Sequence, residues 1–308
     1  MSATLIPDVN HLDQHDRQLV LRLAHECEQI DQVSPLNESA RLALDAVNAT
    51  STHWLVREDD SFIGYAQWDS RERTVQLMVR PDHRRRGIGM LLAKAVRPPQ
   101  DAQWWAFGDL LGARAFAARL HLVPVRSLLK MSLPMPLDQP HDAQLPADLS
   151  LDHYRDEDLN RLVEVNHAAF AHHPEQGAMT ARDARVRMSQ DWFDPEGLLV
   201  VRDQAGSLVG FHWTKVESPE SGSPEVRRGE VYVIGVDPDH ERRGIGRALL
   251  DAGIVLMQAQ GVEAIDLYVE ASQPRVVQMY RRAGFSVVST DTAYATKAGA
   301  TEKAGATE

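Results

Sequence analysis

The sequence feature that most constrains the fold is an eleven-residue segment that occurs twice. Residues 79–89 read VRPDHRRRGIG and residues 236–246 read VDPDHERRGIG, so the copies differ at two positions. A similar hairpin-like stretch precedes each copy, at residues 61–68 and 207–213. The spacing between the copies far exceeds the period of about 20–50 residues that is typical of solenoid repeats. The 308-residue chain is therefore expected to contain two related domains, each with its own hydrophobic core.

In the second copy, a predicted strand passes through a glycine turn into a predicted helix. Residues 231–236 are apolar and mostly β-branched, and Pro238 ends the strand that they form. Gly244 and Gly246 have no Cβ, so a ligand can approach the backbone, and the first N–H groups of the helix suit a phosphate. Nearby cations are Arg242, Arg243 and Arg247. We therefore predict a site for a diphosphate ligand, with an ordinary basic helix start as the alternative.

Composition and charge exclude several classes of function. The formal net charge is −11, which disfavours non-specific nucleic-acid binding, because that binding needs a basic surface. No stretch reaches the roughly 18 apolar residues of a membrane span, and the N-terminal segment lacks the features of a signal peptide. The single cysteine, Cys27, lies on the apolar face of a predicted helix, where packing is favoured over a role as nucleophile. We expect a cytoplasmic monomer with a small-molecule substrate and no nucleic-acid or membrane partner.

Prolines and charged residues break the hydrophobic periodicity between the two halves of the chain. We expect an N-terminal domain at residues 1–132, a linker at 133–148 and a second domain at 149–295. The tail at 296–308 contains the sequence KAGATE twice and lacks the apolar content to pack. It is therefore expected to be disordered.

Three features beside the second glycine turn could carry chemistry. Glu230 immediately precedes the apolar strand and could accept a proton from an amine, directly or through a water. Tyr280 could return a proton to a leaving thiolate. If the strand bulges near residues 234–236, its N–H groups could hold a thioester carbonyl, and such a donor lowers the barrier by about 3–4 kcal/mol. The alternatives are that Glu230 is an ordinary charged residue at a strand end, that Tyr280 is an aromatic residue of the core, and that the strand pairs without a bulge.

The two halves differ at these positions. Alignment of the two glycine turns places Arg73 opposite Glu230, and alignment of the segments after the later helix places Ala117 opposite Tyr280. The first half therefore keeps the phosphate turn but lacks the proposed base and acid. We infer that it binds the cofactor without catalysing a reaction.

Other site chemistries have little support in the sequence. His172, His173 and Glu175 could suggest a metal, but no further ligand follows at a recognisable spacing, so no metal is expected. There is no G-x-S-x-G nucleophile motif, and no G-K-S/T follows the glycine turn as in a P-loop. The turn also lacks the third glycine of a dinucleotide-binding motif, because Leu249 occupies that position.

The glycine turns resemble the acetyl-CoA-binding motif Q/R-x-x-G-x-G/A of the GCN5-related N-acetyltransferase (GNAT) superfamily. Residues 84–89 fit it fully, whereas Glu241 replaces the first Gln or Arg in residues 241–246. Residues 273–285 resemble the later helix of the superfamily, which follows the arm of the cofactor. The resemblance implies an α/β (α+β) fold of two tandem GNAT domains, each a mixed central β-sheet flanked by helices. It also implies acetyl-CoA as co-substrate.

The tandem layout is similar to that of the mycothiol synthases along nearly the whole chain, the tail excepted. The most telling stretches are residues 168–177, 192–198, 210–216, 230–238, 267–270 and 289–295. This resemblance implies acetyl transfer from acetyl-CoA to the cysteinyl amine of cysteinyl-glucosaminyl-inositol, giving mycothiol. It also implies that the second domain catalyses and that the first binds acetyl-CoA without turnover. We hypothesise direct transfer in a ternary complex. The alternatives are a tandem acetyltransferase for another small-molecule or peptide amine, and a CoA-binding regulatory module.

The same resemblance implies contacts at three ligand sites. The sugar-bearing substrate is expected to contact Glu38, Glu175, Lys215, Glu230 and Tyr268. The acetyl-CoA of the catalytic site is expected to contact Ile234, Gly235, Val236, Glu241, Arg242, Arg243, Gly244, Ile245, Gly246, Arg247, Gln273, Pro274, Arg275, Val276, Val277 and Gln278. A second acetyl-CoA is expected to contact Met78, Val79, Arg80, Arg85, Arg86, Gly87, Ile88, Gly89 and Met90. Without the resemblance, Glu38 would be interpreted as the charged start of a helix and Lys215 as a solvated strand end.

Overall fold

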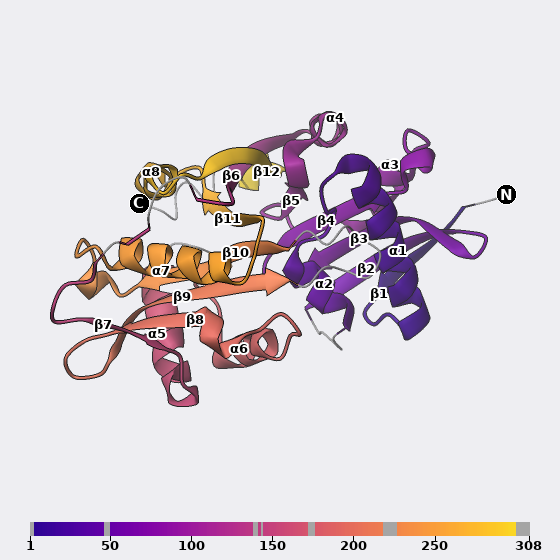
Figure 1. The fold of residues 1–308 in the computed structure, drawn as a ribbon. Coiled ribbons are helices and arrows are strands. Elements are labelled where there is room, and N and C mark those ends of the chain that lie inside the picture. The colour runs from indigo at the N-terminus through magenta and orange to yellow at the C-terminus, as the bar shows by residue number, and fades with distance from the viewer. Residues whose placement is uncertain are drawn as a thin grey trace. The chain divides into compact units, whose positions relative to one another are not determined.

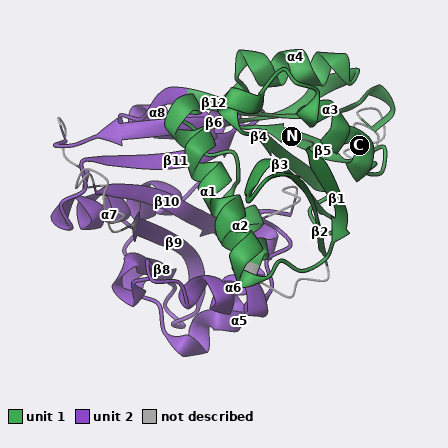
Figure 2. Cartoon of the chain, turned by 90° about the vertical axis from the view of Figure 1, so that its right-hand side faces the viewer, with its two compact units in different colours: residues 1–128, 289–308 green, residues 129–288 purple. Residues whose placement is uncertain are grey.

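The computed structural model describes residues 3–45, 50–137, 141–142, 144–171, 176–217 and 227–299. Contacts between residues divide the chain into two compact units (Figure 2). Unit 1 comprises Met1–Leu128 and Ser289–Glu308, and unit 2 comprises Leu129–Val288. The segment that the sequence analysis treats as a linker thus falls within unit 2, and most of the last strand falls within unit 1.

Unit 1 begins with an edge strand, which two helices follow. These elements are β1 (Thr4–Val9), α1 (Gln14–Asp31), α2 (Glu38–Asp45), β2 (Ser51–Glu58), β3 (Ser61–Asp69), β4 (Thr74–Val79), the 3₁₀ turn η1 (Pro81–His83), α3 (Ile88–Val96), β5 (Gln103–Ala106), the 3₁₀ turn η2 (Phe107–Asp109), α4 (Leu111–Arg119) and the start of β6 (Leu122–Pro134). β1 is a partly exposed edge strand, and its Pro7 weakens the strand signal of this segment in the sequence.

The sheet of unit 1 is mixed and is covered by helices on both faces (Figure 1). Its strands are ordered β1-β2-β3-β4-β5-β12, and the neighbours are antiparallel except β4 and β5, which are parallel. α1 and α2 pack on one face around Leu55 and Tyr65, and α3 packs on the other around Val56 and Ile63. The alternation of side chains along β2 and β3 thus feeds two separate cores.

The strand β12 (Ser286–Thr296) joins unit 1 through antiparallel pairing with β5, for example between Ala293 and Trp105. The Tyr294 hydroxyl also donates a hydrogen bond to Asp109 Oδ1 across 2.7 Å. The sequence analysis placed this strand in the second domain, because hydrophobic alternation does not show which sheet edge a strand joins. The strand ends at Thr296, residues 297–299 are helical, and the rest of the predicted tail lies outside the described residues.

Unit 2 repeats the plan of unit 1. Its elements are the end of β6, β7 (Ser150–His153), the 3₁₀ turn η3 (Asp156–Asp158), α5 (Leu159–Ala169), α6 (Ala181–Met188), the 3₁₀ turn η4 (Pro195–Gly197), β8 (Leu198–Arg202), β9 (Leu208–Glu217), β10 (Arg228–Val236), the 3₁₀ turn η5 (Pro238–His240), α7 (Ile245–Ala259), β11 (Ala264–Glu270) and α8 (Pro274–Arg282). The short, mostly exposed β7 was not predicted. No helix among the described residues is long and apolar enough to cross a membrane.

Helices cover the two faces of the sheet in unit 2, whose strands are ordered β6-β11-β10-β9-β8-β7. α5 and α6 lie on one face, where Phe211, Trp213 and Val233 are buried (Figure 1). α7 lies on the other face, where its residues Leu250 and Ile254 form a core with β10 and β11. Both units are therefore mixed sheets flanked by helices, which confirms the predicted α/β class.

Candidate active site

The glycine turn of unit 2 leaves open space in front of α7. β10 ends at Val236, and α7 begins at Ile245 after the turn η5. Gly244 caps the helix with a φ of 82°, a left-handed conformation that favours glycine. A Cβ added at Gly244 would meet no non-neighbouring heavy atom within 4 Å, and one at Gly246 would meet only Val236 Cγ2, at 3.7 Å. The first N–H groups of α7 therefore face space that a diphosphate can fill.

Aspartates hold two of the three predicted arginines beside this turn. Arg243 Nη2 lies 2.6 and 2.7 Å from the carboxylate oxygens of Asp148. Arg247 Nε lies 2.9 Å from the buried carboxylate of Asp251, which also contacts Nδ1 of His141 at 2.8 Å. Both guanidinium groups are therefore paired with carboxylates of unit 2 itself.

The other residues predicted to contact this acetyl-CoA are mostly exposed. Glu241 and Arg242 are exposed in the turn, and Arg242 has a φ of 59°. At the start of α8, the exposed residues are Gln273, Pro274, Arg275 and Gln278. Val277, by contrast, is buried in the core, so its side chain supports the helix rather than a ligand.

The strands β10 and β11 separate just beyond Glu230. Their parallel ladder comprises three pairs, from Arg228 with Ala264 to Glu230 with Asp266. β10 nevertheless stays paired with β9 as far as Val236. In the described part of both strands, no residue of β10 after Glu230 has a ladder partner on β11. One edge of the second half of β10 is therefore open.

Two backbone N–H groups face this open edge. Asp237 N donates to Val209 O across 2.9 Å, toward the β9 side. Pairing with β9 is regular between Val233 and Val236, so successive N–H groups alternate between the two sides. The N–H groups of Ile234 and Val236 consequently point away from β9. This is the arrangement that the predicted oxyanion donors require.

A β-bulge sets which face of the sheet Glu230 occupies. Val231 pairs with Thr214 and Val233 pairs with Trp213, so Tyr232 is an extra residue on β10. The sequence left open a bulge near residues 234–236 or an undisturbed ladder, and in the structure the bulge lies slightly earlier, at Tyr232. Because side chains alternate along a strand, one extra residue reverses the alternation. Glu230 therefore shares the α5–α6 face with Val233, whereas Val231 packs toward α7.

Three of the five predicted substrate contacts lie on one face of the sheet. Glu230 is half-buried and stands opposite Lys215 of β9, which is 8% exposed. Lys215 Nζ lies 4.9 Å from the ring centroid of Trp192. On β11, Asp266 pairs with Glu230, and Tyr268 is on the same face two residues later, with 45% exposure. The structure thus brings Lys215, Glu230 and Tyr268 to the point where the strands separate.

Tyr280 lies on the other side of the sheet, in the core that α7 and α8 share. Its ring packs edge-on against Phe285 at a centroid distance of 5.8 Å, and the residue is 4% exposed. Burial raises the pKa of Tyr280 above its ordinary value. The phenol is therefore protonated at neutral pH and is a weaker acid than the phenol of an exposed tyrosine.

The glycine turn of unit 1 leaves less space in front of its helix than the glycine turn of unit 2. Gly87 has a φ of 87° and open space around it, as in unit 2. A Cβ added at Gly89, however, would lie 3.2 Å from the ring of Phe116. Met78 and Val79 end β4, and the residues Ile88, Gly89 and Met90 begin α3. The predicted contacts of the second acetyl-CoA thus surround a turn that Phe116 partly fills.

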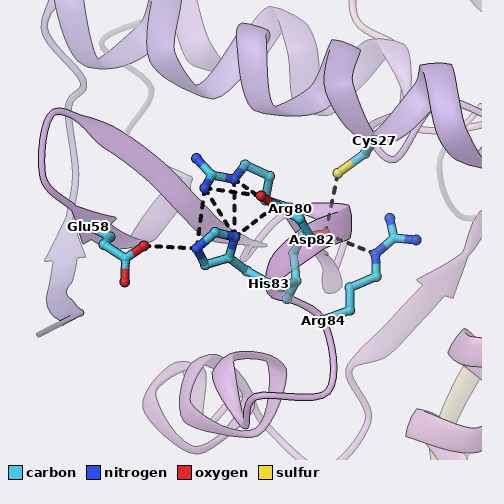
Figure 3. A network of polar contacts seen from close by, with 7 residues as sticks. Cys27, Glu58, Arg80, Asp82, His83 and Arg84 are labelled. Atoms are coloured by element: carbon cyan, nitrogen blue, oxygen red, sulfur yellow. Dashed lines mark hydrogen bonds and ion pairs between the residues drawn. The ribbon is translucent and has the colours of Figure 1, made fainter. Parts of the chain in front are cut away.

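Polar contacts hold the first part of this turn in place (Figure 3). His83 lies between Glu58, at 2.8 Å, and Asp82, at 2.6 Å, and Arg80 also contacts Asp82 at 2.9 Å. Arg84 donates from Nε to the Val79 carbonyl and forms two contacts with Asp31, at 2.6 and 2.7 Å. The first residue of the motif in unit 1 is therefore engaged within the protein. Arg85 has a φ of 64°, and Arg86 is exposed.

Unit 1 lacks the strand bulge that unit 2 has in the β9–β10 ladder. Its β3–β4 ladder runs without a register shift from Gly64 to Asp69, so it contains no counterpart of the Tyr232 bulge. Arg73 lies in the turn before β4 and pairs with Asp101. Ala117 and Tyr280 are each the seventh residue of a nine-residue helix, which supports their predicted correspondence.

Similarity to known proteins extends along both units. Residues 153–285 match the acetyltransferase (GNAT) family, and residues 18–103 match an acetyltransferase (GNAT) domain. The mycothiol acetyltransferase of Propionibacterium freudenreichii subsp. shermanii is 61% identical over 96% of this chain and 93% of that protein. That of Actinosynnema mirum is 39% identical over 92% of this chain and 97% of that protein. The chain belongs to the mycothiol acetyltransferase family.

Solved structures support the same architecture for this member of the mycothiol acetyltransferase family. A GCN5-related N-acetyltransferase from Sphaerobacter thermophilus has a TM-score of 0.65 at 22% identity and covers 95% of this chain and 94% of its own. A tandem GNAT protein from the clavulanic acid biosynthesis pathway has a TM-score of 0.67 at 18% identity, covering 95% and 98%. At these identities the likeness shows the fold alone. It confirms two tandem GNAT domains, and family membership makes the chain an N-acetyltransferase.

The remaining predicted substrate contacts belong to other parts of the mycothiol acetyltransferase chain. Glu38 is half-buried at the first residue of α2 in unit 1. Asn37 precedes it and caps the helix, with Oδ1 accepting from Ala40 N across 2.8 Å. Glu175 lies outside the described residues, as do His172 and His173. Within the described ranges, no three His, Cys, Asp or Glu side chains gather as a metal site would require.

The aromatic surroundings of Lys215 were not predicted from the sequence. Trp192 and Tyr232 both lie under its ammonium group, and Trp213 packs against Tyr232 at a centroid distance of 5.5 Å. Arg187 of α6 donates from Nε to the Tyr232 hydroxyl across 2.8 Å. Trp192 belongs to a stretch that carried the resemblance, but nothing in the sequence signals the contact of Arg187.

Proposed function

We propose that unit 2 transfers the acetyl group of acetyl-CoA to the cysteinyl amine of cysteinyl-glucosaminyl-inositol, giving mycothiol. The observation that carries this proposal is the position of Glu230. Its carboxylate lies at the residue where β10 and β11 separate, on the face that also presents Lys215 and Tyr268. A carboxylate beside the open edge of β10 suits the deprotonation of an incoming ammonium group.

We propose direct transfer with both substrates bound. The acetyl-CoA diphosphate lies at the turn of Gly244 and Gly246, and its thioester reaches the open edge of β10. Glu230 accepts the ammonium proton, directly or through a water, so that a neutral amine can attack the thioester carbon. The N–H groups of Ile234 and Val236 hold the carbonyl oxygen as it gains negative charge. Donors arranged in this way stabilise that charge without reorganising.

Tyr280 is proposed to complete the reaction from the other side of the sheet. The C–N bond forms on the face of Glu230, and the C–S bond breaks toward α8. The Tyr280 phenol carries a proton at neutral pH, which the departing thiolate takes up. Because the base and the acid lie on opposite faces of the sheet, the amine can attack the carbonyl carbon from one side and the thiolate can leave from the other.

Unit 1 is proposed to bind a second acetyl-CoA without turnover, and its Glu38 to contact the sugar-bearing substrate. The support is its intact glycine turn combined with the absence of a bulge in the β3–β4 ladder and the replacement of base and acid by Arg73 and Ala117. We further propose that the enzyme acts as a monomer in the cytoplasm, whose reducing conditions suit a thiol-bearing substrate.

The decisive experiment is acetylation of cysteinyl-glucosaminyl-inositol by the purified protein, followed by mass spectrometry because the acceptor itself carries a thiol. We expect the product to gain one acetyl group. An acceptor with a blocked thiol should still react, whereas one with a blocked cysteinyl amine should not. Preference for an unrelated amine in a substrate panel would favour a different tandem acetyltransferase. Acetyl-CoA binding without any acetylated product would favour a regulatory module.

A further inference from the structure

The bulge in β10 is held from outside the sheet. Tyr232 is the extra residue at the register shift between Val231 and Val233. Its hydroxyl accepts a hydrogen bond from Arg187 Nε across 2.8 Å, and its ring packs against Trp192 at 4.9 Å and Trp213 at 5.5 Å. These side-chain contacts hold Tyr232 at the bulge.

The position of Tyr232 determines the orientation of both the Glu230 carboxylate and the N–H groups of the segment that follows the bulge. With Tyr232 in the bulge, Glu230 is on the same face as Lys215, and the N–H groups of Ile234 and Val236 face the open edge. If Tyr232 entered the regular ladder, the alternation of side chains would shift by one residue. Either Glu230 or the segment after the bulge would then face the wrong way.

We propose that Arg187 and Tyr232 are positioning residues, whose hydrogen bond fixes the bulge that aims Glu230 and the N–H groups of residues 234 and 236. This proposal rests on the function proposed for unit 2. Arg187 acts through Tyr232 and does not touch the reacting atoms. The Arg187 guanidinium also forms a hydrogen bond within α6, in which its Nη1 donates to the Asp183 carbonyl at 3.3 Å.

The same contacts couple the bulge to Lys215. Its Nζ lies 5.6 Å from the ring centroid of Tyr232 and 4.9 Å from that of Trp192. A cation above two aromatic faces is attracted to both rings. A shift of Tyr232 therefore also changes the cation–π contact of Lys215, which stands opposite Glu230. Helix α6, which contributes no predicted catalytic residue, thereby influences the geometry of the base.

The test compares Tyr232→Phe, Arg187→Met, Arg187→Lys and the double variant of Tyr232→Phe with Arg187→Met. Tyr232→Phe keeps the ring stacking and removes only the hydroxyl. Arg185→Met is the matched control, since Arg185 is an exposed arginine of the same helix. Two readouts are used: steady-state acetyl transfer to cysteinyl-glucosaminyl-inositol, and hydrogen–deuterium exchange of the peptide that spans residues 228–237, which needs no turnover.

We expect Tyr232→Phe and Arg187→Met to lower kcat by about tenfold, as for loss of one hydrogen bond to a charged group, while the KM for acetyl-CoA is retained. The double variant should lose no more than Arg187→Met alone, and Arg187→Lys should recover part of the loss. Exchange in residues 228–237 should accelerate in the impaired variants and remain at the wild-type rate in Arg185→Met.

Wild-type kcat and exchange in Tyr232→Phe would overturn the proposal, as would losses that multiply in the double variant. A wild-type enzyme that does not acetylate this acceptor would instead overturn the proposed function. The exchange measurement then still decides the structural part: unchanged exchange in both single variants would show that the hydrogen bond does not hold the bulge.

Discussion

Glu230 stands directly opposite Lys215 in the β9–β10 ladder, so the proposed base lies beside a lysine that is 8% exposed. Opposite charges at directly paired positions attract each other across strands. This pair lies at the residue of β10 beyond which the strand no longer pairs with β11. The paired strands therefore position the residues that are proposed to bind the acetyl acceptor. The open backbone edge that follows is proposed to bind the thioester of the acetyl donor.

Replacement of Lys215 by Met should weaken acceptor binding selectively. The methionine retains an apolar stem against Trp192 and Tyr232 but loses the charge. We expect kcat/KM for cysteinyl-glucosaminyl-inositol to fall roughly tenfold or more, because hydrogen bonds to charged groups contribute about 1.5–3 kcal/mol. The KM for acetyl-CoA should not change. Lys94→Met, at an exposed position of α3, is the control. Equal kinetics in the two variants would contradict a substrate role for Lys215.

Replacement of Glu230 by Gln should remove the base and leave the fold intact. Glutamine has nearly the same shape, so the β9–β10 pairing should persist. We expect kcat to fall by about 10²–10⁴-fold, the usual contribution of a general base. Titration calorimetry should show unchanged acetyl-CoA affinity. A folded variant with full turnover would rule out Glu230 as the base.

Replacement of Gly246 by Ala should impair acetyl-CoA binding without reducing stability. The new Cβ would lie 3.7 Å from Val236 Cγ2, an ordinary contact, so Tm should be maintained or slightly raised. It would nevertheless occupy the space in front of the helix N-terminus. We expect the Kd for acetyl-CoA to rise roughly tenfold, equivalent to about 1.4 kcal/mol. The control is Gly112→Ala, at another open helical position. Unchanged Kd in Gly246→Ala would place the diphosphate elsewhere.

The frame of the site could be predicted because local residues encode it. A β-branched strand, a proline and two glycines define the turn from Val236 to Gly246, and the structure contains it as expected. The residue at which β10 bulges could not be predicted, because the apolar pattern of residues 231–236 is the same whether or not Tyr232 enters the regular ladder. The contact of Arg187 joins residues 45 positions apart, and the placement of β12 depends on the edge of β5. Such features arise from tertiary packing, which a local pattern does not contain.

The thiol of Cys27 should be unreactive in the folded protein. Cys27 is fully buried in α1, and its Sγ lies 3.5 Å from the Val79 carbonyl (Figure 3). Burial raises the pKa of the Cys27 thiol to about 11. Since the thiolate is the reactive form, iodoacetamide at about pH 8.5 should label the native protein far more slowly than the urea-unfolded protein. Equal labelling rates would show that this part of unit 1 opens readily.

Arg202 should stabilise unit 2 in a pH-dependent way. Its Nη1 and Nη2 contact the two oxygens of the buried Asp158 carboxylate at 2.8 and 2.7 Å, and its Nε contacts Asp152 at 2.7 Å. The hydrogen bonds from Arg202 hold the pKa of both carboxyl groups below the ordinary aspartate value. A carboxyl group whose pKa is lower in the folded state stabilises the fold above its unfolded pKa of about 3.9. That contribution disappears as pH falls through the folded value.

Arg202→Met should therefore lower the free energy of unfolding by about 3 kcal/mol at neutral pH, because it leaves a buried carboxylate without its partner. The deficit should begin to shrink below about pH 4, where the unfolded chain takes up protons, and should disappear as pH falls through the lowered pKa of Asp158 in the folded wild type. Arg155→Met is the control: Arg155 contacts Asp152 at 2.8 Å but is largely exposed, so its loss should cost at most about 1 kcal/mol. Urea unfolding of the three proteins at neutral and acidic pH measures both effects. A deficit in Arg202→Met that stays constant with pH would show that packing of the arginine stem, not its ion pairs, stabilises the start of unit 2.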